Sequence, residues 1–249
     1  MDALTISAAS GMQSRMDTLD LLANNLANAE TSGYKTDREF YGLYVSSDAS
    51  SDIGGEFVST LPVVERQWTD FSQGTMTTTG SPLDIALSGR GFMAVNGPTG
   101  VLYTRNGHLK ISPGGELLTG DDYPVRSAGT NGKTIRVASD KPIEISPDGN
   151  ITQDGQPLGQ IELVDFQSSG SLRKMTAAAF QNTDPAVVPA AATKVQVQQG
   201  QVETSNVAVP EAAMRLVSVM RQFEMLQKAV TLDSQMWQQG VQEVAKVTS

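Results

Sequence analysis

Apolar side chains recur at the spacing of an α-helix near the start of the chain. Between residues 3 and 29 there is no proline, and apolar residues return every three or four positions. These positions are Leu4, Ala8, Met12, Met16, Leu19, Leu22 and Leu26. Such a spacing places side chains on one face of a helix. The pattern predicts a long amphipathic helix that ends at the Asn- and Gly-containing stretch 28–33, where left-handed backbone is tolerated.

The C-terminal segment repeats this pattern. Pro210 and Glu211 are typical of a helix start, because proline fits the first turn and an acidic side chain is favoured at the positive end of the helix dipole. Apolar residues follow at Leu216, Met220, Phe223, Leu226, Val230, Trp237, Val241 and Val244. Asp233 interrupts the stripe. The pattern predicts a second long helix over residues 211–246.

Neither helix can bury its apolar stripe alone, and the simplest partner of each is the other. The residues expected at this helix–helix interface are Met12, Leu19, Leu22, Leu26, Leu216, Met220, Phe223, Leu226 and Val230. Two interpretations stay open. The helices either form an ordinary hairpin within one subunit, or they form a coiled-coil shaft that also packs on neighbouring subunits.

The period of the pattern changes to two in the middle of the chain. Short strands are expected over residues 83–87, 92–95, 107–111, 134–137, 143–145 and 160–166. Asn-Gly dipeptides start at residues 96, 106 and 131, and Asp-Gly dipeptides start at 148 and 154. These dipeptides favour tight hairpins because both residue types tolerate a positive φ. The middle of the chain is therefore expected to be an all-β sandwich or barrel.

Together these patterns predict an α+β protein. Its N- and C-terminal helices are expected to pair with each other as a coiled coil, and a central all-β domain of short strands lies between them in the sequence. The expected parts are an N-terminal helix (1–35), an extended connector (36–73), the central β domain (74–183), a return connector (184–210) and a C-terminal helix (211–249). The Ser- and Asp-rich stretch 46–55 and the prolines Pro185 and Pro189 indicate the connectors. We expect both terminal segments to be loosely held in an isolated subunit.

Composition removes most classes of catalytic chemistry. The 249 residues include no cysteine and one histidine, so disulfides, thiolate metal sites and His-rich metal sites are excluded. His108 lies beside an expected turn, where a surface role fits better than catalysis. The glycines around residues 89–94 and 132–134 resemble nucleotide-binding loops, but a strand rather than a helix is expected after each. We predict no catalytic, cofactor-binding or metal-binding residues.

Charge and hydropathy also limit the partners. The net charge of −9 disfavours binding to a phosphate backbone, so no nucleic-acid partner is expected. No stretch approaches the ~20 apolar residues of a membrane helix. Asp2 stands where a secretory signal has positive charge, and the first basic residue is Arg15. We expect no membrane insertion, and we expect any export to proceed without a cleavable signal peptide.

The segment 22–35, Leu-Ala-Asn-Asn-Leu-Ala-Asn-Ala-Glu-Thr-Ser-Gly-Tyr-Lys, resembles the N-terminal signature of the bacterial flagellar axial proteins. Residues 80–92 and 103–107 resemble the β-domain core of the rod and hook proteins, and Ser205-Asn206-Val207 resembles their C-terminal entry. The matching motif residues are Asn24, Asn25, Asn28, Gly33, Tyr34 and Lys35. The asparagines are expected either to bond neighbours or to cap the helix, and Gly33 is expected to permit the helix exit.

Within that family the chain most resembles the basal-body rod protein of the proximal rod, with the slightly longer distal paralogue close behind. The run Met220-Arg221-Gln222-Phe223-Glu224 departs from the common C-terminal pattern of the family. The resemblance implies a non-enzymatic structural subunit that polymerises helically through its terminal helices into a torque-transmitting drive shaft and export channel. It implies other rod subunits, copies of the same chain and the flagellar type III export apparatus as partners, and a location in the rod, which crosses the periplasm.

Two other functions fit the residues without the resemblance. One is a β-sandwich binding module, for example for a surface glycan, carried on a helical stalk. The other is a hydrolase with a pair of acidic residues, although no spacing in the sequence identifies such a pair.

Overall fold

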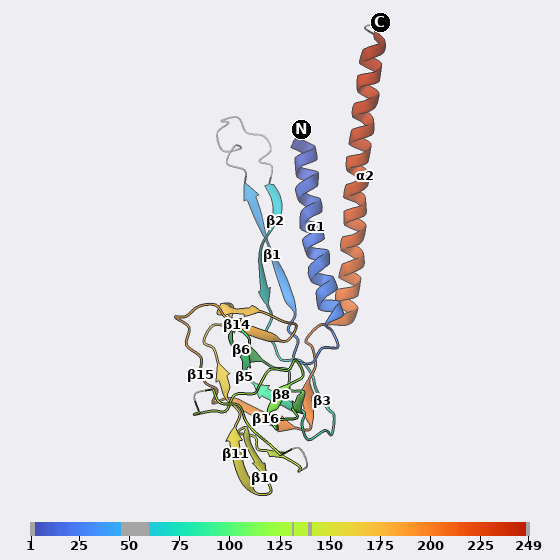
Figure 1. The fold of residues 1–249 in the computed structure, drawn as a ribbon. Coiled ribbons are helices and arrows are strands. Elements are labelled where there is room, and N and C mark those ends of the chain that lie inside the picture. Colours follow the sequence, from blue (N-terminus) through green and yellow to red (C-terminus); the bar gives the residue numbers. More distant parts are fainter. Residues whose placement is uncertain (1–2, 46–59, 131, 139–140, 248–249) are drawn as a thin grey trace. The chain divides into compact units, whose positions relative to one another are not determined.

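The computed structural model describes residues 3–45, 60–130, 132–138 and 141–247 (Figure 1). The chain forms two compact units. We call residues 1–27, 37–68 and 208–249 the helical unit, and residues 28–36 and 69–207 the β unit. The two long helices are α1 (Ala3–Ala27) and α2 (Val209–Val247). Two helices and many short antiparallel strands confirm the expected α+β class.

The strands lie between the two helices in the sequence. The first two, β1 (Asp37–Val45) and β2 (Thr60–Thr69), pair in a two-stranded sheet of their own. The others are β3 (Met76–Thr78), β4 (Ile85–Gly89), β5 (Phe92–Gly97), β6 (Gly100–Thr104), β7 (Leu109–Ile111), β8 (Leu117–Thr119), β9 (Glu144–Ile145), β10 (Asn150–Gln153), β11 (Gln156–Gln160), β12 (Leu163–Asp165), β13 (Leu172–Lys174), β14 (Ala179–Asn182), β15 (Ala190–Ala191), β16 (Val195–Gln199) and β17 (Gln201–Glu203). A short 3-10 helix, η2 (Ser169–Ser171), precedes β13.

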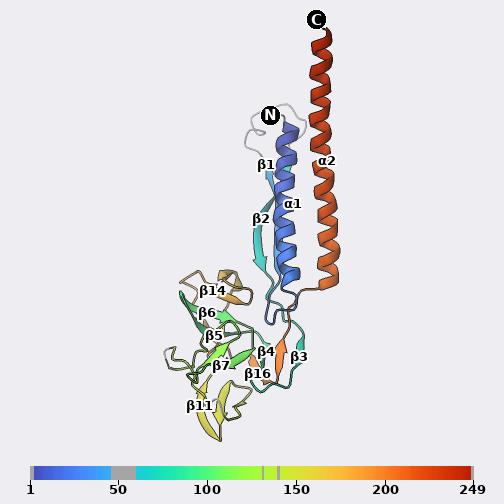
Figure 2. The ribbon, with the colours of Figure 1, turned by 45° about the vertical axis from the view of Figure 1, so that its right-hand side comes forward.

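In the helical unit, α1 and α2 run side by side in opposite directions (Figures 1 and 2). A Cβ built on Gly11 would lie 3.7 Å from Leu226 Cδ1, so the helices approach closely where α1 carries no side chain. Leu21 and Leu22 on α1 and Val219 on α2 are buried. Strand β1 belongs to the same unit, and Arg215 of α2 donates to Glu39 of β1 at 2.6 Å.

Among the side chains that the structure describes, the buried line of α2 differs from the expected stripe at one position. The side chains of Trp237, Val241 and Val244 lie outside the described residues. Met220 is 48% exposed, whereas its neighbour Val219 is 5% exposed. Residues 216, 219, 223, 226 and 230 alternate steps of three and four, which keeps them on the line that faces a partner helix. One residue further along, the side chain points ~100° away. On α1, Met16 is likewise exposed, and the buried positions include the polar Ser14 and Thr18.

The β unit is built on a six-stranded sheet with the order β13-β14-β6-β5-β12-β15, in which all neighbours are antiparallel. Smaller sheets complete the unit: β16 pairs with β4, β17 with β3, β7 with β8, and β10 lies between β11 and β9. In both of the first two pairs, a strand from the C-terminal side of the unit binds one from its N-terminal side.

Strand β5 is buried on both faces, which explains its continuous apolar run. Phe92 and Ala94 face an aromatic cluster, and Met93 and Val95 face a larger aliphatic core. In the aromatic cluster Phe180 packs edge-to-face on Phe71, with the ring centroids 5.0 Å apart. The aliphatic core is made by Ile, Leu and Val residues of β4, β6 to β10 and β16 and of segments between the strands. The β unit therefore has its own hydrophobic core.

The turns follow the sequence signals in part. Asp154 and Gly155, with φ of 52° and 74°, close the β10–β11 hairpin as expected. Gly107 instead lies against β4, where an added Cβ would clash with the Ile85 carbonyl oxygen. Residues 134–137, expected to form a strand, make only isolated bridges such as Arg126 with Thr134. Residue 131 lies outside the described residues.

The boundaries of the β unit also differ from the expected domain 74–183. The expected return connector 184–210 contains β15, β16 and β17, because these strands have partners within the β unit. The expected connector 36–73 contains β1 and β2, and the Ser-rich stretch 46–55 lies outside the described residues. At the N-terminal side, residues 28–36 belong to the β unit and not to the helical one.

We predict that Phe180→Ala lowers the free energy of unfolding of the β unit by about 3–5 kcal/mol, because it removes a buried ring from the aromatic cluster. Urea unfolding followed by circular dichroism measures this change. His108→Ala is the control. His108 is half exposed and its Nδ1 lies 2.8 Å from Asp84, so the loss of this surface pair should cost about 1 kcal/mol or less. Equal losses in the two variants would contradict the assigned core.

Candidate functional sites: a buried polar joint and the faces of the helices

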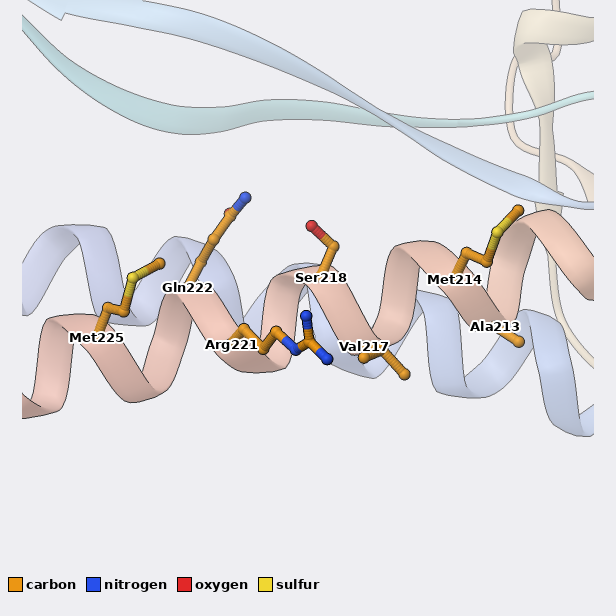
Figure 3. Close-up of a pocket in the computed structure, with 7 residues that line it drawn as sticks. All are labelled: Ala213, Met214, Val217, Ser218, Arg221, Gln222 and Met225. Atoms are coloured by element: carbon orange, nitrogen blue, oxygen red, sulfur yellow. The ribbon is translucent and has the colours of Figure 1, made fainter.

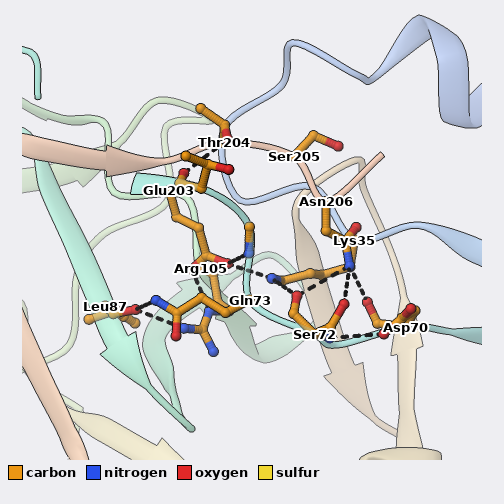
Figure 4. A network of polar contacts seen from close by, with 12 residues as sticks. Lys35, Asp70, Ser72, Gln73, Leu87, Arg105, Glu203, Thr204, Ser205 and Asn206 are labelled. Carbon is orange, nitrogen blue, oxygen red and sulfur yellow. Dashed lines mark hydrogen bonds and ion pairs between the residues drawn. The ribbon is translucent and has the colours of Figure 1, made fainter. Parts of the chain in front are cut away.

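Three charged side chains meet in the interior of the β unit. The Lys35 ammonium donates to Glu203 Oε1 at 2.5 Å and to the Ser72 carbonyl oxygen at 2.7 Å (Figure 4). The other Glu203 oxygen accepts from Arg105 Nε at 2.7 Å. The side chains of Lys35 and Glu203 are fully buried, and that of Arg105 is almost so. One carboxylate therefore forms ion pairs with two cations that are buried from water.

The remaining polar groups of this cluster are bonded to the backbone. The Arg105 guanidinium donates to the carbonyl oxygens of Leu87 and Gly89 at 2.8 and 2.9 Å, and the Gly74 amide donates to Glu203 at 2.9 Å. Burial lowers the pKa of the Lys35 ammonium, and the adjacent Glu203 carboxylate opposes that shift. Buried charges are tolerated when they are paired with an opposite charge and their remaining donors and acceptors are hydrogen-bonded, as they are here.

Asn206 connects three segments of the β unit near its boundaries. Its Oδ1 accepts from the backbone amide and the hydroxyl of Thr36 at 2.8 and 2.7 Å. Its Nδ2 donates to the carbonyl oxygen of Asp70 at 2.8 Å, and the Asp70 amide donates to the Thr36 carbonyl oxygen at 2.8 Å. We call Lys35, Arg105, Glu203 and Asn206 the polar joint.

Gly33 and Tyr34 fit the N-terminal segment into this joint. Gly33 has φ of 70°, and a Cβ there would lie 2.4 Å from the Asn106 backbone nitrogen, so only glycine fits. The Gly33 amide donates to the Glu203 carbonyl oxygen at 2.8 Å. Tyr34 is fully buried, and the Lys174 ammonium lies 4.0 Å from the centre of its ring. The Gly-aromatic-Lys exit of the sequence motif is thus interior structure of the β unit.

The three asparagines of the motif have separate surroundings. Asn25 is buried and exchanges two hydrogen bonds with the backbone of Asp37, at 2.8 and 3.0 Å, which fixes the start of β1 beside α1. Asn28 accepts bonds from the backbone amide and hydroxyl of Thr31 at 3.1 and 3.3 Å, as a local turn at the helix end. Asn24 is exposed on α1.

Most of the residues expected at the helix–helix interface are at least half-buried within the single chain. Leu22 is buried, and the half-buried residues are Met12, Leu19, Leu26, Leu216, Phe223, Leu226 and Val230. Met220 is the exception, as described above. The apolar stripe did not indicate two residues of the helix faces that meet, Val219 and Gly11. Val219 lies beside the expected position Met220, and Gly11 has no side chain.

A second face of α2 is apolar and open. A surface groove on this helix is lined by Ala213, Met214, Val217, Ser218, Arg221, Gln222 and Met225 (Figure 3). The exposed large apolar side chains along α2 are Val209, Met214, Val217, Met220, Met225, Leu232 and Met236. Runs of exposed apolar side chains of this kind are typical of interaction surfaces.

Sequence analysis missed Arg105 and Glu203. Arg105 lies in a segment noted only for its family resemblance, and Glu203 stands in a short run of alternating residues without a further signal. Within the described ranges no group of three or more acidic or histidine side chains could hold a metal ion. No helix in the described part of the chain has the length and apolarity needed to cross a membrane.

Three sequence models of flagellar families match separate parts of the chain. The model described as flagella basal body rod protein matches residues 7–35, and the hook protein FlgE/F/G D1 domain matches residues 86–153. The C-terminal model of the basal body rod FlgEFG proteins matches residues 198–243. The polar joint takes Lys35 from the first segment, Arg105 from the second, and Glu203 and Asn206 from the third.

Curated relatives align over almost the whole chain. The flagellar basal-body rod protein FlgF of Caulobacter vibrioides is 30% identical over 232 residues, covering 92% of each chain. The flagellar basal-body rod protein FlgG of Bacillus subtilis is 30% identical over 259 residues, covering 94% of this chain and 96% of that one. FlgG of Borreliella burgdorferi is 28% identical, covering 92% and 94%. The chain therefore belongs to the flagellar basal-body rod proteins, and it is a structural subunit of the rod and not an enzyme.

Proposed function

We propose that the subunit polymerises helically through its two terminal helices, with α1 and α2 paired as a coiled coil inside each subunit and the open face of α2 packed on neighbouring subunits. In this arrangement the helices form the torque-transmitting shaft and line the export channel. The partners are copies of the same chain and other rod subunits. The flagellar type III apparatus is the proposed export route, without signal cleavage, to a rod that crosses the periplasm.

The observation that carries this proposal is the apolar surface that α2 leaves uncovered. Because α1 and α2 are antiparallel and Gly11 meets Leu226, the start of α1 lies level with about residue 234 of α2. Leu232 and Met236 are exposed near that point, and Met214, Val217 and Met225 are exposed beside α1. Burying each of these side chains is worth about 1.5–3 kcal/mol, so they favour association.

The pairing within one subunit rests on the alternating steps of three and four along α2 and on the close approach at Gly11. That spacing is typical of helices that supercoil around each other. The buried Leu22 and Val219 are the residues we assign to the centre of the pair, with Phe223 and Leu226 beside them.

We also propose the proximal part of the rod as the position of this subunit. The alignment with the Caulobacter vibrioides FlgF spans 232 positions, whereas the alignments with FlgG relatives span 249 to 259 positions over about the same share of this chain. The FlgG alignments therefore contain more gaps. Identity alone does not separate the two paralogues, since both reach 30%.

We predict that Val217→Asp or Met225→Asp blocks incorporation into the rod while leaving the monomer folded, because both side chains are exposed in the single chain. Rod-associated protein, measured by immunoblot of purified basal bodies, should fall by about tenfold or more, since 1.4 kcal/mol is a factor of ten. Gln227→Asp, at an exposed polar position of the same helix, is the control and should assemble normally. Normal swimming of both variants at normal protein levels would contradict the assembly face.

We predict that Leu22→Asp abolishes motility by a different route. Leu22 is 4% exposed, so the variant loses about 1.5–3 kcal/mol of apolar burial and places an unpaired charge between the helices. The isolated subunit should lose helical circular dichroism, which the exposed-face variants should retain. Ala23→Asp, at the adjacent exposed position of α1, is the control. Unchanged helicity of Leu22→Asp would rule out the pairing of α1 with α2 in the monomer.

A further inference from the structure

The N-terminal segment of the β unit is bonded to residues that come 168 to 170 positions later in the chain. Further contacts come from Ser72, Asp70 and Lys174, whose ammonium donates to the Lys35 carbonyl oxygen at 2.7 Å. Gly33 donates its amide to the Glu203 carbonyl oxygen, and Lys35 donates to the Glu203 carboxylate. Thr36 donates its amide and hydroxyl to Asn206. The carboxylate partner of the buried Lys35 and the side-chain partner of Thr36 therefore both lie in the segment that follows β16, which we call the return segment (residues 200–206).

Charge strengthens the contact between Lys35 and the return segment. Lys35 and Arg105 are both buried, and each repels the other. The main compensation is the Glu203 carboxylate, whose two oxygens bind one cation each, and Asp70 adds a weaker attraction to Lys35. Without that carboxylate the interior would hold two neighbouring cations, and an uncompensated buried charge is among the most destabilising defects in proteins.

The central sheet contacts the Glu203 carboxylate through Arg105, which directly follows β6, and is otherwise held by other contacts. The β5–β6 hairpin and its neighbours β12 and β14 are joined by backbone pairing between residues 92 and 182. They also pack on apolar cores that include Phe71, Ile85 and Val197, none of which belongs to the polar joint. The return segment contributes β17, which pairs with β3. Because a chain is synthesised from its N-terminus, Glu203 is made after both of its cationic partners, Lys35 and Arg105.

We propose that the return segment is a closing element: residues 28–36 dock onto the β unit only when Glu203 and Asn206 are in place. The central sheet folds without this step. A chain whose C-terminal part has not arrived, or is held elsewhere, keeps its N-terminal segment undocked. Docking of residues 28–36 therefore requires that the return segment is already bound to the β unit.

Hydrogen exchange of the full-length monomer tests this. In Glu203→Gln, amides of residues 28–36 should exchange about 100-fold faster or more, while those of residues 92–102 change by less than about threefold. Asn206→Ala, which removes no charge, should accelerate residues 28–36 by about tenfold. Glu162→Gln is the matched control, since it breaks an ion pair with Arg126 elsewhere in the β unit and should leave residues 28–36 unchanged.

A double variant separates charge from loss of packing. Lys35→Met in the Glu203→Gln background leaves one cation in place of two, so exchange of residues 28–36 should slow by about tenfold or more relative to Glu203→Gln alone. Pulse labelling during refolding of the wild-type chain should protect residues 92–102 first, and residues 28–36 together with 201–203 later.

Three outcomes would overturn the proposal. Wild-type protection of residues 28–36 in Glu203→Gln would remove the role of the carboxylate. Equal loss of protection over residues 28–36 and 92–102 in Glu203→Gln and Asn206→Ala would show a single cooperative unit with no separate closing step. Protection of residues 28–36 before residues 201–203 during refolding would reverse the proposed order.

Discussion

The segments at the two ends of the β unit are held together by one buried carboxylate that binds two buried cations. Glu203 accepts from Lys35 and Arg105 at once, and each of these cations also donates to backbone carbonyl oxygens. The chain passes between the two units at 27/28, 36/37, 68/69 and 207/208, and Asn206 bonds segments beside the last three of these points. The fixed positions of those chain segments in the β unit therefore rest on a few polar contacts.

The two units satisfy their apolar side chains in different ways. The β unit buries its own aliphatic core and an aromatic cluster, so its stability needs no partner. The helical unit buries Leu22 and Val219 but leaves several methionines of α2 exposed. Methionine is flexible and polarisable, so a methionine-rich face can adapt to neighbours that differ in shape.

The difference between Met220 and Val219 shows how an apolar pattern can mislead by one residue. Both side chains are apolar, and both continue a helical spacing from Leu216. The stripe with steps of four selects Met220, while the alternation of three and four selects Val219. In α1 the buried line includes Ser14 and Thr18, which an apolar pattern cannot select, and Thr18 is accommodated by donating its hydroxyl to the Ser14 carbonyl oxygen.

The sequence by itself determined the two long helices, the all-β middle and the family, because these depend on local periodicity, turn chemistry and contiguous motifs. The Asp154-Gly155 hairpin and the run Phe92–Val95 are examples in which a local signal fixed a local structure. Only the tertiary structure decided that Lys35, Arg105, Glu203 and Asn206 meet, and that residues 28–36 and 184–207 belong to the β unit. The physical reason is sequence separation: a charged residue in the sequence reads as a surface residue until the fold brings its distant counter-charge to it.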